Sequence, residues 1–225
     1  GDGAGGVSAD RVGGGAAGMS AATYLKTNKA LLIEMPSSNS LLSPWNIMIK
    51  PEIELKRKMI EAGNGMNNKK LLNKFIKSYK EILNDLRTMG ISFRKSNIGF
   101  VPDYRFPGTE VKRIINRYIA KKGIEIIKSK VEKFLVNKTG NIKGVVVRAL
   151  DNSTINIVFD YLILAGGGLS SFFDFTTGEK TVNGSILALC YENNFEITNI
   201  EFFMFHPFLI IDKRFPRVLV SGEIL

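Results

Sequence analysis

Three glycines near the start of the chain have the spacing of a nucleotide-binding loop. Gly13, Gly15 and Gly18 form the pattern G-x-G-x-x-G, directly before a segment whose apolar residues recur at helical spacing. In such a loop the first glycine permits a tight turn, the second lets backbone approach a pyrophosphate, and the third allows close helix packing. The N–H groups at the helix N-terminus then face the negative charge. An ordinary glycine-rich turn is the alternative interpretation.

An acidic residue stands where a dinucleotide-binding unit needs one. Glu34 lies 21 positions after Gly13, at the end of the apolar run Leu31–Ile33. A carboxylate there accepts hydrogen bonds from both ribose hydroxyls and disfavours a 2′-phosphate. A surface glutamate at a strand end is the alternative, but the glycines upstream favour the ribose role.

A second glycine run closes a later apolar segment. Leu162–Ala165 leads into Gly166, Gly167 and Gly168. Small residues at a strand exit let backbone lie close to a cofactor, although a simple turn would have the same composition. Two glycine-terminated strands far apart in sequence are a stronger indication than one.

Helices and strands alternate around these loops. Apolar periodicity predicts helices at Glu52–Ala62, Lys69–Met89 and Glu110–Lys122. Short apolar runs predict strands at Ile124–Ile127, Val131–Val136, Val145–Leu150, Ile155–Phe159 and Tyr161–Ala165. The pattern indicates an α/β fold with an antiparallel insert.

The region before the glycine loop is harder to assign. Gly1–Asp10 is glycine-rich without apolar periodicity, so it is expected to be a flexible leader. Only Arg11 and Val12 directly precede the loop. The first strand is therefore expected to be irregular, to begin as early as Val7, or to be missing.

Composition excludes several classes of protein. No apolar run approaches the roughly 18 residues of a membrane span, and no signal peptide is visible, so a cytoplasmic protein without a membrane span is expected. The net charge of +10 comes from basic residues spread along the chain, which favours a solvated surface over a nucleic-acid site. The single cysteine, Cys190, and single histidine, His206, predict no disulfide framework and no metal site.

Three motifs together resemble one family of flavoproteins. The loop Gly13–Gly18 continues as Met-Ser-Ala-Ala, Ala165–Gly167 reads Ala-Gly-Gly, and Asn199–Pro207 reads Asn-Ile-Glu-Phe-Phe-Met-Phe-His-Pro. These segments are similar to motifs of the succinate dehydrogenase/fumarate reductase flavoproteins. The segment Ala62–Met66, before a long helix, resembles the L-aspartate oxidase branch in particular. The resemblance covers most of the chain, from Val12 onward.

The resemblance implies a fold and a cofactor. It implies a Rossmann-like FAD-binding domain at residues 11–190, after a leader at 1–10, and the start of a smaller α+β capping domain at 191–225. It also implies noncovalent FAD, with Glu34 on the ribose and the backbone of Val131 near adenine. The residues expected to contact FAD are Gly13, Gly15, Ala17, Gly18, Glu34, Val131, Ala165, Gly166, Gly167 and Gly184.

The resemblance further implies an activity and a substrate. The expected reaction is FAD-dependent oxidation of L-aspartate to iminoaspartate in NAD biosynthesis. His206, Ser221 and Glu223 are expected to bind the small dicarboxylate substrate. The family's catalytic arginine is expected beyond Leu225, so no catalytic residue is assigned, and the oligomeric state stays open.

Two other functions are compatible with the same residues. A succinate dehydrogenase or fumarate reductase type of flavoprotein would act on succinate or fumarate. A non-catalytic FAD-binding remnant is indicated by Met204 and Phe208, which stand where the family has a glutamine and a threonine. His206 itself has an alternative interpretation as a loop histidine ordered by Pro207.

Overall fold

Two compact units make up the chain. The computed structural model describes residues 9–27, 29–35, 37–48, 50–97, 99–205, 209–210 and 218–219. The first unit combines the residues up to Leu42 with those from Ile119 onward, and the second is Ser43–Tyr118. The domain boundaries expected at residues 10 and 190 remain predictions.

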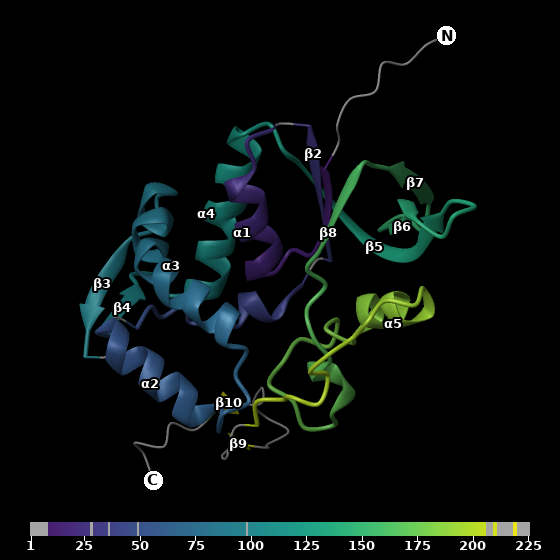
Figure 1. The fold of residues 1–225 in the computed structure, drawn as a ribbon. Helices are drawn as coiled ribbons and strands as arrows, with labels where there is room; N and C mark the ends of the chain where they lie inside the picture. The colour runs from purple at the N-terminus through teal and green to yellow at the C-terminus, as the bar shows by residue number, and fades with distance from the viewer. Residues whose placement is uncertain are drawn as a thin grey trace. The chain divides into compact units, whose positions relative to one another are not determined.

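The first unit is built around a six-stranded sheet with the strand order β7-β6-β5-β2-β1-β8. Figure 1 shows this sheet with α1 on one face and α5 beside β5. The elements of this unit are β1 (Ala9–Val12), α1 (Ala16–Tyr24), β2 (Ala30–Glu34), η1 (Asn39–Leu41), β5 (Glu125–Val136), β6 (Ile142–Ala149), β7 (Thr154–Val158), β8 (Tyr161–Leu164), η2 (Ser170–Phe172), α5 (Ser185–Glu192), β9 (Leu209–Ile210) and β10 (Val218–Leu219).

Parallel and antiparallel pairing divide the sheet. Strands β8, β1, β2 and the start of β5 run parallel, whereas β5, β6 and β7 form an antiparallel meander. The α/β fold with an antiparallel insert is therefore confirmed.

The first strand, which the sequence left open, is present. Strand β1 is present from Ala9 to Val12 and pairs with β2 on one side and with β8 on the other. Ala9 and Asp10, expected in the leader, thus belong to the sheet. Strand β1 is only four residues long, and its pairing with two neighbouring strands defines it, which a local side-chain pattern does not report.

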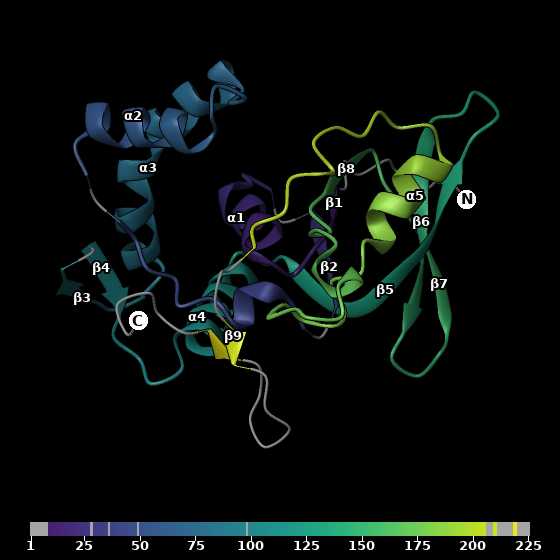
Figure 2. The same cartoon turned by 90° about the horizontal axis from the view of Figure 1, so that it is seen from below.

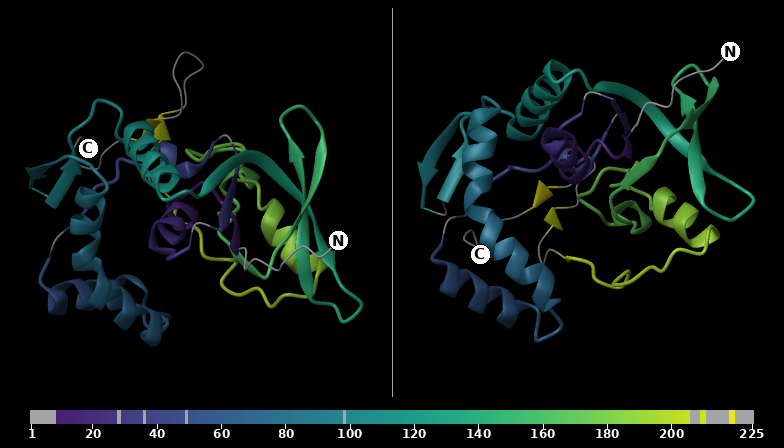
Figure 3. Two further views of the ribbon diagram at one scale, coloured as in Figure 1. Left: turned by 90° about the horizontal axis from the view of Figure 1, so that it is seen from above. Right: turned by 45° about the horizontal axis from the view of Figure 1, so that its top comes forward.

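The two strands expected at 124–127 and 131–136 are one strand. Residues Leu31–Glu34 of β2 pair with Glu125–Lys128, and the rest of β5 pairs with β6. The pairing with β6 shifts between Val131 and Lys133, so that Glu132 is the extra residue of a β-bulge. A bulge bends a strand, and both views in Figure 3 show the curved path of β5.

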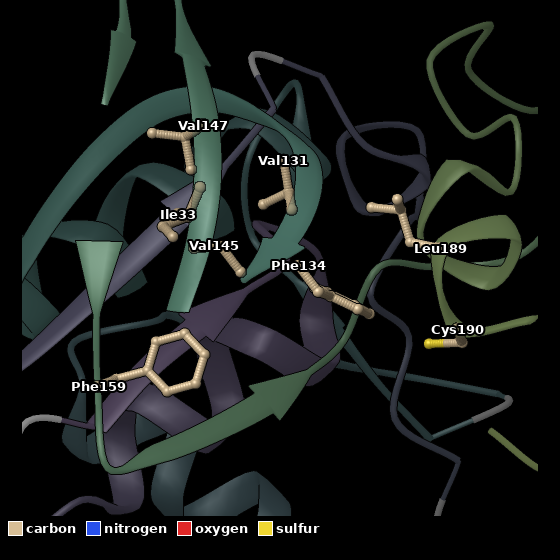
Figure 4. Packing of buried hydrophobic residues seen from close by; sticks show 8 residues of the cluster. All are labelled: Ile33, Val131, Phe134, Val145, Val147, Phe159, Leu189 and Cys190. Atoms are coloured by element: carbon tan, nitrogen blue, oxygen red, sulfur yellow. The ribbon is translucent and has the colours of Figure 1, made fainter. Parts of the chain in front are cut away.

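A hydrophobic cluster joins the meander to α5. Phe134, Val145 and Val147 are almost fully buried and contribute side chains from β5 and β6. Leu189 and Cys190 extend from α5 toward Phe134, as Figure 4 shows. This packing holds α5 against the sheet.

The second unit contains a helical hairpin and a small β-ribbon, and α4 begins in it. Its elements are α2 (Glu52–Ala62), α3 (Lys69–Thr88), β3 (Phe93–Ser96), β4 (Gly99–Pro102) and α4 (Pro107–Lys121). Figure 2 shows α2 beside the start of α3. Asn68 caps α3 by accepting hydrogen bonds from the N–H groups of Lys70 and Leu71.

The helix predictions for this unit are confirmed, and their boundaries agree to within one residue except at the start of α4. Helix α4 begins at Pro107, three residues before the expected Glu110, because proline is well suited to a first helical turn. In the part of the chain that the structure describes, the helices are all too short or too polar to cross a bilayer.

Candidate functional site

A cavity of about 500 Å³ opens at the carboxyl ends of three parallel strands. Strands β2, β1 and β8 are adjacent in the sheet, and the residues just after each of them line this cavity. The N–H of Gly13 donates to Ile33 O over 2.8 Å, which fixes the first loop against β2. Ligands of open α/β sheets bind at this edge, and the volume suits a nucleotide-sized ligand.

The three glycines of the motif differ in what a side chain would contact at each position. Gly13 has φ +137°, and a Cβ there would lie 1.9 Å from Ala165 O. A Cβ on Gly18 would lie 1.7 Å from Gly13 O, so this glycine lets α1 approach the loop. Gly15 differs, because its Cβ would meet only Ser40 Oγ at 3.4 Å. Gly15 lines the cavity and leaves room for a ligand to approach the backbone.

The N-terminus of α1 gives the cavity a positive character. The helix begins at Ala16 beside the cavity and has no acidic residue in its first turn. The helix dipole and the N–H groups of a first helical turn favour an anion there. Lys130 adds a full positive charge and is the only charged residue among the described residues that line the cavity.

Glu34 lies at the base of the glycine loop. Its side chain is 2% exposed, and a Cβ on Gly14 would lie 2.2 Å from Glu34 Oε2. The carboxylate thus packs against the Gly14 backbone. In the sequence, Glu34 stands between Ile33 and Met35, which both line the cavity. Gly14 occupies a variable position of the G-x-G-x-x-G motif, and its lack of a side chain leaves space for the Glu34 side chain.

A hydroxyl-rich segment forms a second wall that the sequence motifs did not reveal. Ser37, Ser38, Asn39 and Ser40 all line the cavity after β2. Ser40 Oγ accepts a hydrogen bond of 2.8 Å from the N–H of Ala16, which caps α1. The sequence could have indicated this wall by the position of the four polar residues directly after a predicted strand. Polar residues that follow a parallel strand lie at the ligand-binding edge of the sheet.

Residues far along the chain hold this serine segment in place. Ser37 Oγ and Thr181 Oγ1 are 2.8 Å apart, and Asn39 Nδ2 donates to Ser170 Oγ over 3.1 Å. The N–H of Glu179 donates to Asn39 Oδ1 over 2.7 Å. These hydrogen bonds connect the loop after β2 to the loop after β8.

The loop after β8 forms the opposite wall. Ala165, Gly166 and Gly167 line the cavity, and a Cβ on Gly166 would lie 2.4 Å from Ile186 of α5. Small residues here let α5 approach the strand exit. Cys190 also lines the cavity from α5, and burial raises the pKa of its thiol, so the group stays protonated near neutral pH.

The structure brings most of the sequence-predicted cofactor residues to one place. Those lining the cavity are Gly13, Gly15, Ala17, Val131, Ala165, Gly166 and Gly167. Gly18, Glu34 and Gly184 stand behind the lining: Gly18 packs on Gly13, and Gly184 begins α5 with φ +74°. Their roles toward a ligand remain predictions.

The predicted substrate residues cannot be placed. His206, Ser221 and Glu223 lie outside the described residues. Among the residues that are described, no group of three or more His, Cys, Asp or Glu side chains is arranged to hold a metal ion.

A smaller, aromatic cavity of about 120 Å³ adjoins the serine segment. Ser170, the hydrogen-bond partner of Asn39, lines it together with Phe173, Phe203 and Phe205. The Phe173 ring is 4.9 Å from that of Phe203 and 5.4 Å from that of Phe205, both nearly edge to face. None of the described residues that line this cavity carries a positive charge.

Known proteins resemble this chain in both sequence and fold. The chain is 25% identical to L-aspartate oxidase of Bacillus subtilis in an alignment of 177 residues that covers 72% of this chain and 33% of that protein. It is 23% identical to L-aspartate oxidase of Clostridium perfringens in an alignment of 237 residues, gaps included, that covers 95% of this chain and 54% of that protein. The chain thus spans about a third to a half of these relatives.

A solved structure of similar fold is the open conformation of a flavocytochrome c3 fumarate reductase. Its TM-score is 0.81 at 19% identity, over 97% of this chain and 45% of that one. The family resemblance seen in the sequence motifs is therefore confirmed.

The described cavity fits the expected cofactor. Glycines that leave backbone open, a helix N-terminus and one lysine are suited to a pyrophosphate. The model of the FAD binding domain family matches residues 57–224, a region that lies after the glycine loop and so supports FAD independently of it. FAD is confirmed as the cofactor, and the chain belongs to the FAD binding domain family.

Proposed function

We propose that the chain contributes to FAD-dependent oxidation of L-aspartate to iminoaspartate, a step of NAD biosynthesis, in the cytoplasm. The cavity at the carboxyl ends of β1, β2 and β8 is the observation that carries this proposal. The aspartate oxidases of Bacillus subtilis and Clostridium perfringens among its relatives support the choice of substrate.

The residues around the cavity would hold FAD noncovalently. Gly15 and the N-terminus of α1 would face the pyrophosphate, and Lys130 would add a compensating charge. Glu34 would accept hydrogen bonds from the ribose hydroxyls, and the Val131 backbone would lie near adenine. Acid precipitation tests the noncovalent mode: flavin left attached to the denatured chain would contradict it.

Bound FAD supplies a two-electron acceptor for substrate oxidation. Oxidation of L-aspartate to the imine removes a hydride from Cα and a proton from the amino group. The protein must therefore orient Cα and fix both carboxylates. His206, Ser221 and Glu223 are proposed to bind the dicarboxylate, and the His206→Asn substitution should raise KM for aspartate while FAD stays bound.

An absorbance experiment tests the proposed function. The purified chain is incubated with FAD, desalted, and mixed anaerobically with L-aspartate, with D-aspartate and succinate as matched controls. The expected result is that the retained flavin bleaches with L-aspartate and stays oxidised with D-aspartate and with succinate. Bleaching with succinate instead would point to a succinate dehydrogenase or fumarate reductase type of reaction, and no bleaching at all would reject turnover by this chain.

A second candidate is FAD binding without turnover. The aromatic cavity favours it, because Phe173, Phe203 and Phe205 offer no charged partner for a carboxylate. Met204, in place of the family's glutamine, is 85% exposed beside them. Retained flavin that stays oxidised with every dicarboxylate tested would support this candidate.

A further inference from the structure

The positive charge of the chain is concentrated in one unit. Residues 43–118 contain 16 Lys and Arg against 7 Asp and Glu, a net charge of +9. The remaining 15 basic and 14 acidic residues give the other unit only +1. Such an asymmetry indicates a polyanionic partner for the second unit.

Several lysines of the α2–α3 hairpin have no acidic partner. Lys56, Lys69, Lys70, Lys74 and Lys77 are exposed, and none of them forms an ion pair with another described residue. Intramolecular pairing therefore leaves their charge available to a partner.

The same hairpin also exposes apolar side chains. Helix α2 has no buried residue, although Ile53 and Ile60 lie two turns apart on one face with Lys56 and Arg57 between them. Ile53 is 85% exposed and Ile60 is 42% exposed. Met66, in the turn that leads to α3, is 65% exposed.

We propose that the α2–α3 hairpin binds the surface of an anionic lipid bilayer. Aliphatic residues next to lysines are typical of helices that lie in a membrane interface: the apolar groups enter the acyl boundary and the cations contact the headgroups. Nucleic acid fits less well, because the apolar side chains most exposed on the hairpin, Ile53, Met66 and Leu71, cannot stack on bases as aromatic residues do. This inference concerns a surface outside the FAD cavity.

Co-sedimentation of the full chain with vesicles tests the inference. The chain should pellet with phosphatidylcholine vesicles that contain phosphatidylserine and stay in solution with pure phosphatidylcholine. Binding should weaken between ~0.1 M and ~1 M salt, where the Debye length falls from about 10 to about 3 Å. No pelleting with the anionic vesicles would overturn the proposal.

Paired variants distinguish insertion of the apolar side chains of the hairpin from attraction by the overall charge of the chain. The Ile53→Ser substitution should weaken vesicle binding about ten-fold, whereas Leu150→Ser, at a residue 69% exposed in the other unit, should not. Replacing Lys56 and Lys69 by glutamine should cost on the order of 25-fold. Equal effects of Ile53→Ser and Leu150→Ser would contradict insertion.

Further readouts exclude unfolding and a different anionic partner. The substituted side chains are exposed, so circular dichroism melting should be unchanged in each variant. Replacing Lys138 and Lys143, exposed in the other unit, by glutamine should leave vesicle binding unchanged. Duplex DNA or RNA that displaces the chain from vesicles, with affinity insensitive to Ile53→Ser, would overturn the lipid assignment in favour of a nucleic-acid surface.

Discussion

Substituting Gly18 and Gly15 separately distinguishes a glycine needed by the fold from one needed by the ligand. Gly18 lies in α1, where helix propensity alone would make alanine more stable by up to about 1 kcal/mol. Its Cβ would, however, lie 1.7 Å from Gly13 O, a backbone atom that cannot move away without shifting the loop. Overpacking of this kind costs about 1–3 kcal/mol or more, so the clash should outweigh the propensity.

The two variants should behave differently in two assays. After the propensity gain is subtracted, a net loss of about 1–2 kcal/mol lowers Tm by roughly 2–8 °C in a domain of this size, and we expect this for Gly18→Ala measured by circular dichroism without FAD. Gly15 has φ −85° and ψ −178°, which alanine adopts readily. Gly15→Ala should therefore cost only about 1 kcal/mol as a changed N-cap.

The effect of Gly15→Ala should appear in cofactor binding. Its methyl group would occupy the side of the loop that faces the cavity, so FAD affinity measured by calorimetric titration should fall about ten-fold, equivalent to ~1.4 kcal/mol. Wild-type melting of Gly18→Ala would refute the close approach of α1 to the loop. Wild-type FAD affinity of Gly15→Ala would refute the placement of the pyrophosphate.

Other substitutions test the remaining parts of the site and core. Glu34→Gln should weaken FAD binding about ten-fold, because a neutral amide is a poorer acceptor for ribose hydroxyls; unchanged affinity would remove the ribose assignment. Ser40→Ala takes away the acceptor for the Ala16 N–H and should lower Tm by roughly 2–4 °C; an identical melting curve would contradict this capping role. Phe134→Ala empties the cluster between the meander and α5 and should destabilise the fold by about 3–5 kcal/mol in urea unfolding, and a loss below about 1 kcal/mol would refute that packing. Because burial raises the pKa of Cys190, its alkylation should be slower than that of free cysteine at pH 8, should accelerate as pH rises, and should be blocked by bound FAD; alkylation at the same rate with and without FAD would place the cofactor elsewhere.

Local patterns in the sequence were sufficient for most elements and for one wall of the site. The face of α3 shows why, since Leu72, Ile76 and Tyr79 recur at helical spacing and are all buried. The glycine loop could likewise be recognised, because its tight turn depends on neighbouring residues at a fixed spacing. Phe75 follows the same apolar spacing but is 42% exposed, so spacing alone does not fix the edge of the buried face.

Only the tertiary structure decided which distant segments complete the site and where the charge lies. Strand β8 pairs with β1, so Ala165 lies against Gly13, and Ser37 contacts Thr181, although these pairs are far apart in the chain. Periodicity reports which residues are apolar, but strand order depends on long-range pairing that leaves no local pattern. The sequence likewise showed a net charge of +10 from basic residues spread along the chain. The division into compact units shows that residues 43–118 carry +9 of this net charge.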